Sequence, residues 1–516
     1  MLLWFVVAYW VISVAIGLWA SLRVKNTSDF AVAGRQLPFY MVTATVFATW
    51  FGSETVLGIP ATFLQENLHG VVADPFGSSL CLILVGIFFA APLYRMKLLT
   101  IGDFYKRRYG RGVEVLTTIA IVLSYLGWVG AQISALGLVF NIVSLGSVSV
   151  VTGMWIGSAT ILIYTFFGGM WAVAITDFIQ MIIIVLGMLW IGGEVAGQAG
   201  GVGTVVQHAV DHGKFDFWPK ASFPEIAAFV AAWCTMMFGS MPQQDVFQRV
   251  QSAKSEKIAV WASILGGSLY FLFAFVPMFL AYSATLIDPK MVDANLAEGG
   301  DPQMILPTLV LNHAPLIAQI LFFGALLSAI KSCASATLLA PSVTFTENIL
   351  REMFPMNDKQ LLRAMRIVTL IFTILVTLYA INSDASIFKM VENAYQVTLV
   401  SAFIPLACGV YWKRATNQGA LFAIFAGTTL WLALTFSAEM TPEQVHKLPS
   451  GLDWLIMLIQ PLQVFTPQGA GLIASALGMI IGSLLPQMFK HDPDAHHRLR
   501  HGHHAHDSHR KAVGGH

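Results

Sequence analysis

The chain has 516 residues, of which 56% are hydrophobic and only 11% are charged, with a mean hydropathy of +0.69. About a quarter of the residues of an ordinary soluble domain are charged, so this composition excludes a soluble globular protein and indicates an integral membrane protein. The formal net charge of +1 gives no information about partners, and the sequence contains no nucleic-acid-binding signature.

Apolar runs close to twenty residues long follow one another along the chain. A run of that length crosses about 30 Å of hydrocarbon as an α-helix. The sequence therefore predicts an all-α integral membrane protein with about thirteen transmembrane helices, at residues 2–22, 38–63, 71–94, 114–142, 148–167, 172–194, 226–241, 258–284, 316–345, 365–382, 390–411, 418–437 and 469–488.

The distribution of basic residues predicts how these helices are oriented. Cytoplasmic loops hold an excess of Lys and Arg, and placing the N-terminus outside puts most of the 29 basic residues on the inner side. The first run lacks the basic leader and the cleavage site of a signal peptide, so we expect it to span the membrane. The prediction is a multi-pass plasma-membrane protein in contact with lipid, with its N-terminus outside and its C-terminus in the cytoplasm.

Cysteine and histidine residues indicate neither disulfides nor a metal site. All four cysteines lie inside the apolar runs, where we expect packing thiols: Cys81, Cys234, Cys333 and Cys408. Most of the 14 histidines lie in the tail, residues 491–516. A His-rich tract can bind a divalent metal, but no spacing there fixes a coordination geometry. We therefore predict a disordered cytoplasmic tail and no metal.

Two apolar runs contain residues that weaken a helix. FATWFGSETVLGIPA, residues 47–61, has two glycines and a proline around Glu54, and AAWCTMMFGSMPQQDVFQRV, residues 231–250, has a glycine and a proline. Helix breaks in hydrocarbon are tolerated only where the backbone faces protein or a water-filled cavity. Paired breaks are typical of inverted-repeat transporters, so we expect non-helical stretches at Gly52–Gly58 and Phe238–Pro242 that face one another near mid-membrane.

The run at 316–345 contains an unusual charge. Lys331 lies within SAIKSCASATLLAPSVTFTENIL, residues 328–350, and a lysine at membrane depth costs about 3 kcal/mol or more unless it is paired or hydrated. Glu54 is the only carboxylate deep in the run 38–63. We therefore expect Lys331 and Glu54 to form a buried pair, directly or through water.

Several motifs resemble those of the sodium:solute symporter family: AGRQL, GGMWAVAITDFIQ, PQQDVFQRV, DPQMILPTLV and YWKRATNQGA. The likeness extends over residues 1–490, and FAVAGR and TATVFATW are most similar to the choline-transporter branch. The resemblance implies a LeuT-type fold of two inverted five-helix repeats, at 38–194 and 226–411, within a transmembrane transporter domain of residues 1–490.

The resemblance also implies an ion site. In the family, a sodium ion is held by carbonyls on the first broken helix, and by a carbonyl and two hydroxyls on a later helix. The matching residues here are Ala48, Phe51, Ala329, Ser332 and Cys333. The thiol of Cys333 is a poor ligand for a hard cation, and Lys331 stands where relatives have an apolar residue. The family motif around Asp177 implies a place on the inner ion-exit path.

Two interpretations of the coupling ion stay open. In the first, Lys331 points away and sodium binds through the remaining oxygens. In the second, the ammonium takes the place of sodium, and its protonation and deprotonation couple transport to the proton gradient. Because both Lys331 and Cys333 depart from the family pattern, the hypothesis to test first is the second, with transport that depends on pH more than on sodium.

Candidate substrate-binding residues come from the broken helices and from the start of the run 390–411. They are Ser53, Glu54, Thr235, Met236, Glu392, Tyr395 and Gln396. The last three share one helix face at i, i+3 and i+4. A carboxylate and a tyrosine there suit a cationic or amino-bearing solute; the alternative is a polar helix end at the water interface.

The residues and the resemblance together predict a secondary active transporter (symporter). It imports a small organic solute by alternating access, without a cofactor, driven by a sodium or proton gradient; the solute is a cation, an amino acid or a monocarboxylate. The alternative is a transporter-like membrane sensor. An enzyme is not expected, because the apolar runs contain no nucleophile–base pair. The sequence shows no glycosylated outer loop of the eukaryotic kind, which favours a bacterial inner membrane.

Overall fold

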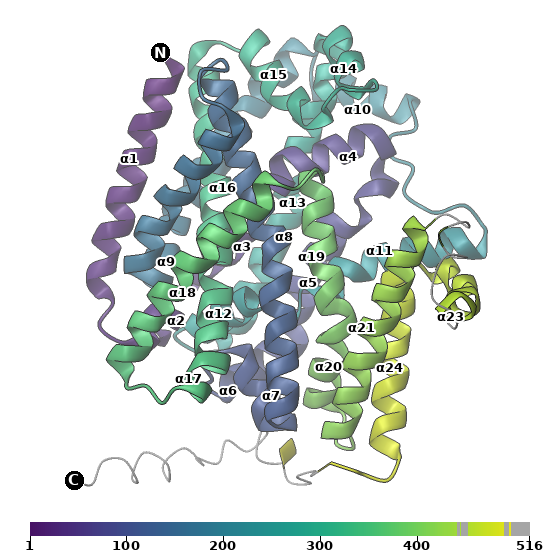
Figure 1. Cartoon of the computed structure of the whole chain (residues 1–516). Helices are drawn as coiled ribbons and strands as arrows, with labels where there is room; N and C mark the ends of the chain where they lie inside the picture. The colour runs from purple at the N-terminus through teal and green to yellow at the C-terminus, as the bar shows by residue number, and fades with distance from the viewer. Residues whose placement is uncertain (441–443, 445–451, 490–494, 497–516) are drawn as a thin grey trace.

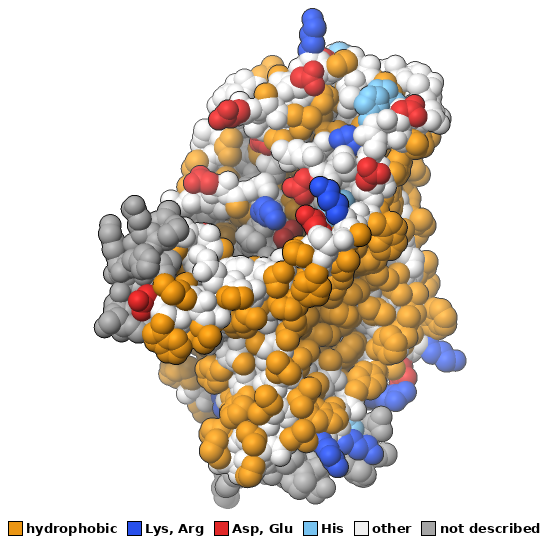
Figure 2. Space-filling model, turned by 90° about the vertical axis from the view of Figure 1, so that its right-hand side faces the viewer, with side chains coloured by type: hydrophobic (Ala, Val, Ile, Leu, Met, Phe, Trp, Pro, Cys, Tyr) orange, Lys and Arg blue, Asp and Glu red, His pale blue; other side chains and the backbone are white. Residues whose placement is uncertain are grey.

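The computed structural model describes residues 1–440, 444, 452–489 and 495–496, and this part of the chain is built of helices. On the face shown in Figure 2, hydrophobic side chains form a broad band across the middle, with charged side chains toward the two ends. This is the surface expected of helices that cross a hydrocarbon layer, where each helix satisfies its own backbone hydrogen bonds. The predicted tail lies almost wholly outside the described residues.

The first half of the chain begins with α1 at one edge of the bundle (Figure 1). Its helices, with the π-helical turns η3, η5 and η6, are α1 (Leu2–Ala20), α2 (Thr27–Val32), α3 (Phe39–Trp50), η3 (Glu54–Gly58), α4 (Ile59–Glu66), η5 (Val72–Gly77), α5 (Ser78–Leu84), η6 (Val85–Phe89), α6 (Ala90–Arg95), α7 (Ile101–Tyr109), α8 (Arg111–Val143) and α9 (Val150–Gln198).

The second half contains α16, whose side chains are buried along most of its length and which packs mainly against α8 and α9 of the first half. Its helices, with the π-helical turn η8, are α10 (Val202–Asp211), α11 (Phe223–Gly239), α12 (Gln244–Ser252), α13 (Glu256–Ile287), α14 (Pro289–Leu296), α15 (Ile305–His313), α16 (Leu316–Phe345), η8 (Thr346–Leu350), α17 (Arg351–Met353), α18 (Asp358–Ile381), α19 (Ile387–Ser401), α20 (Phe403–Tyr411), α21 (Asn417–Glu439), α23 (Leu452–Ile459) and α24 (Pro467–Leu484).

The number of spanning helices depends on how broken helices are counted. Nine helices in the described residues are long and apolar enough to cross a membrane, or eleven if each of two bent pairs is one span. The predicted runs 148–167 and 172–194 both lie in α9, which is kinked at Gly169 (φ 48°, ψ −139°). The run 38–63 is divided after α3, which is too short to count. The second run within α9 and the run 38–63 account for the difference between eleven spans and the thirteen predicted runs.

Both predicted helix breaks are present, but the first is shorter than predicted. The helix α3 ends at Trp50, Phe51 has non-helical angles (φ −84°, ψ 77°), and π-helical structure resumes at Glu54. The prediction of a non-helical stretch as far as Gly58 is therefore wrong. The second break separates α11, which still includes Phe238 and Gly239, from α12, and the two helices meet at 44°. The predicted start of this break at Phe238 is therefore two residues too early.

Side-chain hydroxyls satisfy the backbone at both breaks. Thr55 Oγ1 donates to the carbonyl of Trp50 at 3.1 Å, and Thr398 Oγ1 donates to the carbonyl of Gly239 at 2.6 Å. This is how an interrupted helix is stabilised away from water. A third break, between α19 and α20, bends the chain by 46° and was not predicted, although Pro405 shortly after it is a residue that weakens a helix.

Candidate solute and ion site

Glu54 begins the turn η3 in the first break, and its side chain is buried. Its carboxylate accepts hydrogen bonds from Gln132 Nε2 at 2.6 Å and from Trp128 Nε1 at 3.2 Å, both on α8. The oxygen of the same Gln132 amide accepts from the backbone N–H of Ser53 at 2.9 Å. A single amide, with a donor end and an acceptor end, thus fixes both the carboxylate and the broken backbone.

Lys331 faces a different part of the molecule. Its side chain is fully buried, and its ammonium has no hydrogen-bond partner in the described part of the chain. The nitrogen lies 4.5 Å from the ring centre of Trp10, 5.5 Å from that of Tyr9 and 5.7 Å from that of Tyr164. Ring faces carry negative potential, and one such contact with a desolvated cation is worth about 2 kcal/mol.

Lys331 and Glu54 therefore make no direct contact among the described residues, and a pair through water stays a prediction. Successive residues of an α-helix point about 100° apart, so Lys331 can face α1 and α9 while Cys333, two residues later, faces the first break. Cys333 Sγ lies 4.0 Å from Glu54 Oε1. Neutral rings compensate the charge of the ammonium, and two of them lie on α1, a helix outside the predicted repeats.

The residues matched to the family ion site lie where the first break meets α16. A Cβ added to Gly52 would lie 2.8 Å from Cys333 Sγ, so the backbone of the break approaches α16 as closely as only a glycine allows. The matched residues are all buried: Ala48, Phe51, Ala329, Ser332 and Cys333.

Asp177 of α9 connects the same two helices. Its Oδ1 accepts from Ser332 Oγ and its Oδ2 accepts from Thr45 Oγ1, both at 2.6 Å. All three side chains are completely buried. The group therefore brings four oxygen atoms together, and oxygen is the ligand that hard cations prefer. The role of Asp177 on an exit path stays a prediction.

Aromatic rings from α3, α8 and α19 gather beside Glu54. The ring centre of Trp50 lies 5.6 Å from that of Trp128 and 6.1 Å from that of Tyr395, and the last two are 5.3 Å apart. Tyr125 stacks on Trp128 at 6.0 Å. We call Trp50, Trp128, Tyr395 and Tyr125 the aromatic cluster.

Asp245 at the start of α12 is a second buried carboxylate on the aromatic cluster. Its Oδ1 accepts from Tyr125 OH at 2.5 Å and its Oδ2 accepts from Trp50 Nε1 at 3.3 Å. The aromatic cluster therefore joins the two broken helices, with Glu54 from the first and Asp245 beside the second. Among the described residues, Ser53 Oγ, Ser240 Oγ and Tyr395 OH are buried without a hydrogen-bond partner.

Of the predicted substrate residues in α19, only Tyr395 belongs to the aromatic cluster. Glu392 is paired with Lys389, 3.5 Å away, and Gln396 accepts a hydrogen bond from Trp431 on α21 at 3.0 Å. In α11, Thr235 donates to its own helix, to the carbonyl of Ala231, and Met236 is buried. The structure does not show any of these four in contact with Glu54.

Sequence reasoning missed Trp50, Trp128, Gln132 and Asp245 as site residues. Two of them carried a signal, because Gln132 is a polar residue within the run 114–142 and Asp245 is an acid directly after the second break. The two tryptophans carried none, since an aromatic residue in an apolar run is ordinary packing until its neighbours are known.

An all-helical membrane bundle with two broken helices that meet at a buried polar site defines a LeuT-type secondary transporter. The sequence pattern of the sodium:solute symporter family matches residues 30–427, and the chain belongs to this family. The predicted fold class is thereby confirmed, and the chain is a symporter of a small organic solute.

Relatives and solved structures agree with this assignment. The chain is 27% identical over 452 residues to the high affinity choline transporter 1 of Homo sapiens, covering 83% of this chain and 76% of that protein. It is 26% identical over 479 residues to the high-affinity proline transporter PutP of Bacillus subtilis, covering 88% and 97%. The structure of a Na⁺-coupled sialic acid symporter in a substrate-bound outward-open state has a TM-score of 0.75 at 18% identity, covering 94% and 97%. That likeness shows the fold alone, and no relative here supports the sensor alternative.

Proposed function

We propose that this chain imports a small organic cation with an exposed ammonium group, of the choline kind, and that the aromatic cluster binds the cationic head. The observation that carries the proposal is the combination of Trp50, Trp128 and Tyr395 with two buried carboxylates, Glu54 and Asp245. Tryptophan faces attract cations most strongly of the aromatic rings, and stacked aromatic residues are the usual way to recognise a quaternary ammonium group.

The charge of the site supports a cation over a monocarboxylate. An anionic solute beside Glu54 would meet a carboxylate held by neutral donors, and like charges away from water repel by several kcal/mol at an effective dielectric constant of about 20. Asp245 counts less in this argument, because the buried Arg249 donates to its carbonyl at 3.1 Å. The free hydroxyls of Ser53 and Tyr395 could hold a hydroxyl group on the solute. The choline and proline transporters among the relatives agree with an ammonium-bearing solute.

Uptake into proteoliposomes tests the solute class. We expect saturable uptake of choline. Proline should inhibit this uptake weakly, and acetate should not affect it. Trp128→Leu should raise the KM for choline about 30-fold, because about 2 kcal/mol of cation–π attraction is lost, whereas Trp128→Phe should retain part of it. Trp233→Phe is the matched control, since Trp233 packs on Phe229 and Phe217 outside the aromatic cluster. Equal uptake of acetate and choline would contradict the proposal.

We further propose that sodium is the coupling ion. The Lys331 ammonium lies against the rings of Trp10, Tyr9 and Tyr164 and makes no hydrogen bond to the oxygens of the Asp177 group within the described residues, which leaves those oxygens to a cation. This supports the first of the two interpretations left open by the sequence, with sodium held through the remaining oxygens in spite of the thiol of Cys333.

Gradients imposed separately test the coupling ion. An inward sodium gradient at constant pH should drive choline accumulation, and an inward proton gradient without sodium should not. Accumulation driven by the proton gradient alone would restore the hypothesis that the Lys331 ammonium couples transport.

The proposed orientation has the N-terminus outside and the end of the bundle that holds α7 in the cytoplasm. The basic residues gathered at that end support it: Lys97, Lys106, Arg107, Arg108 and Arg111. We assign residues 1–490 to the transporter domain with repeats at 38–194 and 226–411, and we favour a bacterial inner membrane. Impermeant labelling of a cysteine introduced at Lys97 in inside-out vesicles, with no labelling in right-side-out vesicles, would support this orientation.

A further inference from the structure

The short helix α7 lies at the end of the bundle where α6, α17 and α20 also lie (Figure 1). Its start is a capping box, in which the Thr100 hydroxyl accepts from the Asp103 N–H at 3.2 Å and the Asp103 carboxylate accepts from the Thr100 N–H at 3.2 Å. A capping box satisfies the backbone donors at a helix start. The polar contacts of α7 with other helices concentrate at this same turn.

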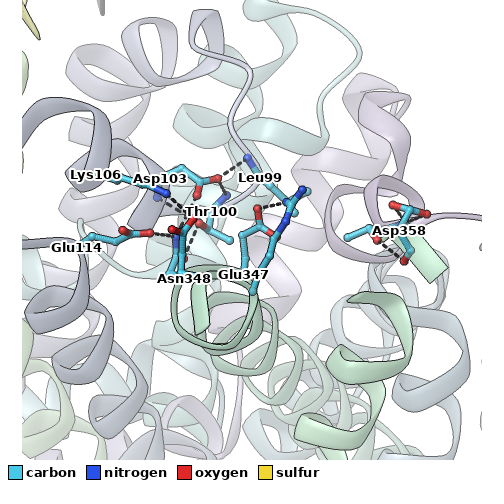
Figure 3. Close-up of polar contacts among 11 residues, drawn as sticks. Leu99, Thr100, Asp103, Lys106, Glu114, Glu347, Asn348 and Asp358 are labelled. Atoms are coloured by element: carbon cyan, nitrogen blue, oxygen red, sulfur yellow. Dashed lines mark hydrogen bonds and ion pairs between the residues drawn. The ribbon is translucent and has the colours of Figure 1, made fainter. Parts of the chain in front are cut away.

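Asn348 of η8 holds the capping box from one side (Figure 3). Its Nδ2 donates to Asp103 Oδ1 at 3.0 Å and to Glu114 Oε1 at 2.9 Å, and its Oδ1 accepts from Thr100 Oγ1 at 2.7 Å. Both amide hydrogens and the amide oxygen are therefore used, and the side chain is completely buried.

The fit between Asn348 and α7 is tight. A Cβ added to Gly102 would lie 2.3 Å from Asn348 Cγ, so no other residue than glycine fits there without a shift of the asparagine. Arg111 at the start of α8 donates to Glu114 at 2.9 Å and to the carbonyl of Asn348. The end of α16, through η8, is thus locked to α7 and α8.

Gln244 of α12 holds the same turn of α7 from the other side. Its Oε1 accepts from the backbone N–H of Ile101 at 2.8 Å, and its Nε2 donates to the carbonyl of Leu99 at 3.4 Å. The first N–H groups of a helix have no acceptor within the helix. Gln244, on the half-helix that follows the second break, supplies the acceptor for the N–H of Ile101.

The far end of α7 holds the third break. Tyr105 OH donates to the carbonyl of Ala402 at 2.8 Å, where α19 bends into α20. Arg108 donates to the carbonyls of Gly409 at 3.1 Å and Ala415 at 2.8 Å, on and after α20. The short helix α7 therefore connects the end of α16, the start of α12 and the bend between α19 and α20.

We propose that Asn348 is a positioning residue for transport: it fixes the start of α7 so that α7 retains Gln244 and keeps this end of the molecule closed. Because α12 packs against α16, opening toward this end would separate the two helices, and Gln244 links α12 directly to the start of α7. Asn348 contacts neither solute nor ion and acts through α7. That this end is cytoplasmic rests on the proposed orientation.

The native thiol of Cys333 reports the opening. It is completely buried next to Glu54 and Gly52 in this closed arrangement, so a membrane-impermeant methanethiosulfonate reaches it only when one side opens. The experiment uses the full chain in vesicles, with Cys81, Cys234 and Cys408 replaced by alanine, and measures the modification rate of Cys333 separately from each side. Choline uptake is recorded in parallel.

We expect Asn348→Ala and Gln244→Ala each to raise the modification rate from the cytoplasmic side about tenfold, because hydrogen bonds to charged or helix-terminal groups are lost. The rate from the outer side should stay unchanged or fall. Asn357→Ala is the matched control and should change neither rate: Asn357 also caps a helix, α18, but is exposed and outside the α7 contacts. If Asn348→Ala does not fold, Asn348→Asp replaces it in the experiment, because aspartate has the same shape as asparagine.

Several outcomes would overturn the proposal. One is an unchanged modification rate of Cys333 from the cytoplasmic side in Asn348→Ala and Gln244→Ala. The other is an equal rise of this rate from both sides, which would indicate a general loosening of the fold. A rise from the outer side alone would support the closing role of α7 and overturn the proposed orientation instead. A cytoplasmic rise in a protein that takes up no choline would support the positioning role while contradicting the proposed solute.

Discussion

Lys331 and Glu54 are two buried charges in one membrane domain that are compensated in different ways. The ammonium lies against the rings of Trp10, Tyr9 and Tyr164 and makes no hydrogen bond within the described residues. The carboxylate accepts hydrogen bonds from Gln132 and from an indole N–H. Opposite charges at similar depth therefore need not pair, because neutral groups with suitable dipoles can stabilise each one separately.

The different surroundings of Lys331 and Glu54 also indicate different roles for them, one in stability and one in transport. The donors around Glu54 come from α8, and the aromatic cluster beside it joins both broken helices, so this region must change when the helices move. The rings around Lys331 belong to α1 and α9, and neither of these is one of the two broken helices. We infer that Glu54 serves solute binding and that Lys331 serves the attachment of α1 to α16.

The largest effect should follow from removal of the carboxylate. Glu54→Leu should raise the KM for choline about 100-fold or abolish uptake, because truncating one partner of a buried charged contact costs about 2 to 5 kcal/mol. Initial uptake rates over a range of choline concentrations measure this. Glu392→Gln is the matched control, since Glu392 is also largely buried but pairs with Lys389, and its KM should stay within about twofold, because a partly exposed ion pair is worth little.

A smaller effect, on stability, should follow from removal of a ring. Trp10→Leu should lower the free energy of unfolding by about 2 kcal/mol, since the buried ammonium loses its nearest ring face. Thermal unfolding of the purified protein in detergent measures this. Trp4→Leu on the same helix should have almost no effect, because Trp4 is 73% exposed. Adding Lys331→Met to Trp10→Leu should restore most of the loss; if it does not, the ring does not stabilise the charge.

The smallest effect should be the interaction energy between the two charges. In a double-mutant cycle of Lys331→Met and Glu54→Gln, we expect the two changes in the free energy of unfolding to add within about 0.5 kcal/mol, as they do for sites without shared partners. An interaction energy above about 1 kcal/mol, on the scale of contacting residues, would show that the two groups are linked in solution.

Composition and motifs determined the class of fold and the place of the breaks. Apolar runs long enough to cross hydrocarbon leave the backbone no choice but helix, and the glycines and prolines near Glu54 and Gln244 marked where two helices are interrupted. The residues matched to the family ion site could also be picked out, because Ser332 and Cys333 lie in a segment that resembles the family, and their part in ion binding stays a prediction. These features depend on local sequence, so no knowledge of neighbouring helices was needed.

Only the tertiary structure decided which side chains meet. Two of the three rings around Lys331 are on α1, more than 300 positions earlier in the chain, and the aromatic cluster combines α3, α8 and α19. The role of Asn348 likewise depends on Thr100 and Glu114 from another part of the sequence. Hydropathy indicates that a residue lies in a spanning helix, but the direction of its side chain and the helix it contacts follow from how the helices pack, which the local pattern does not contain.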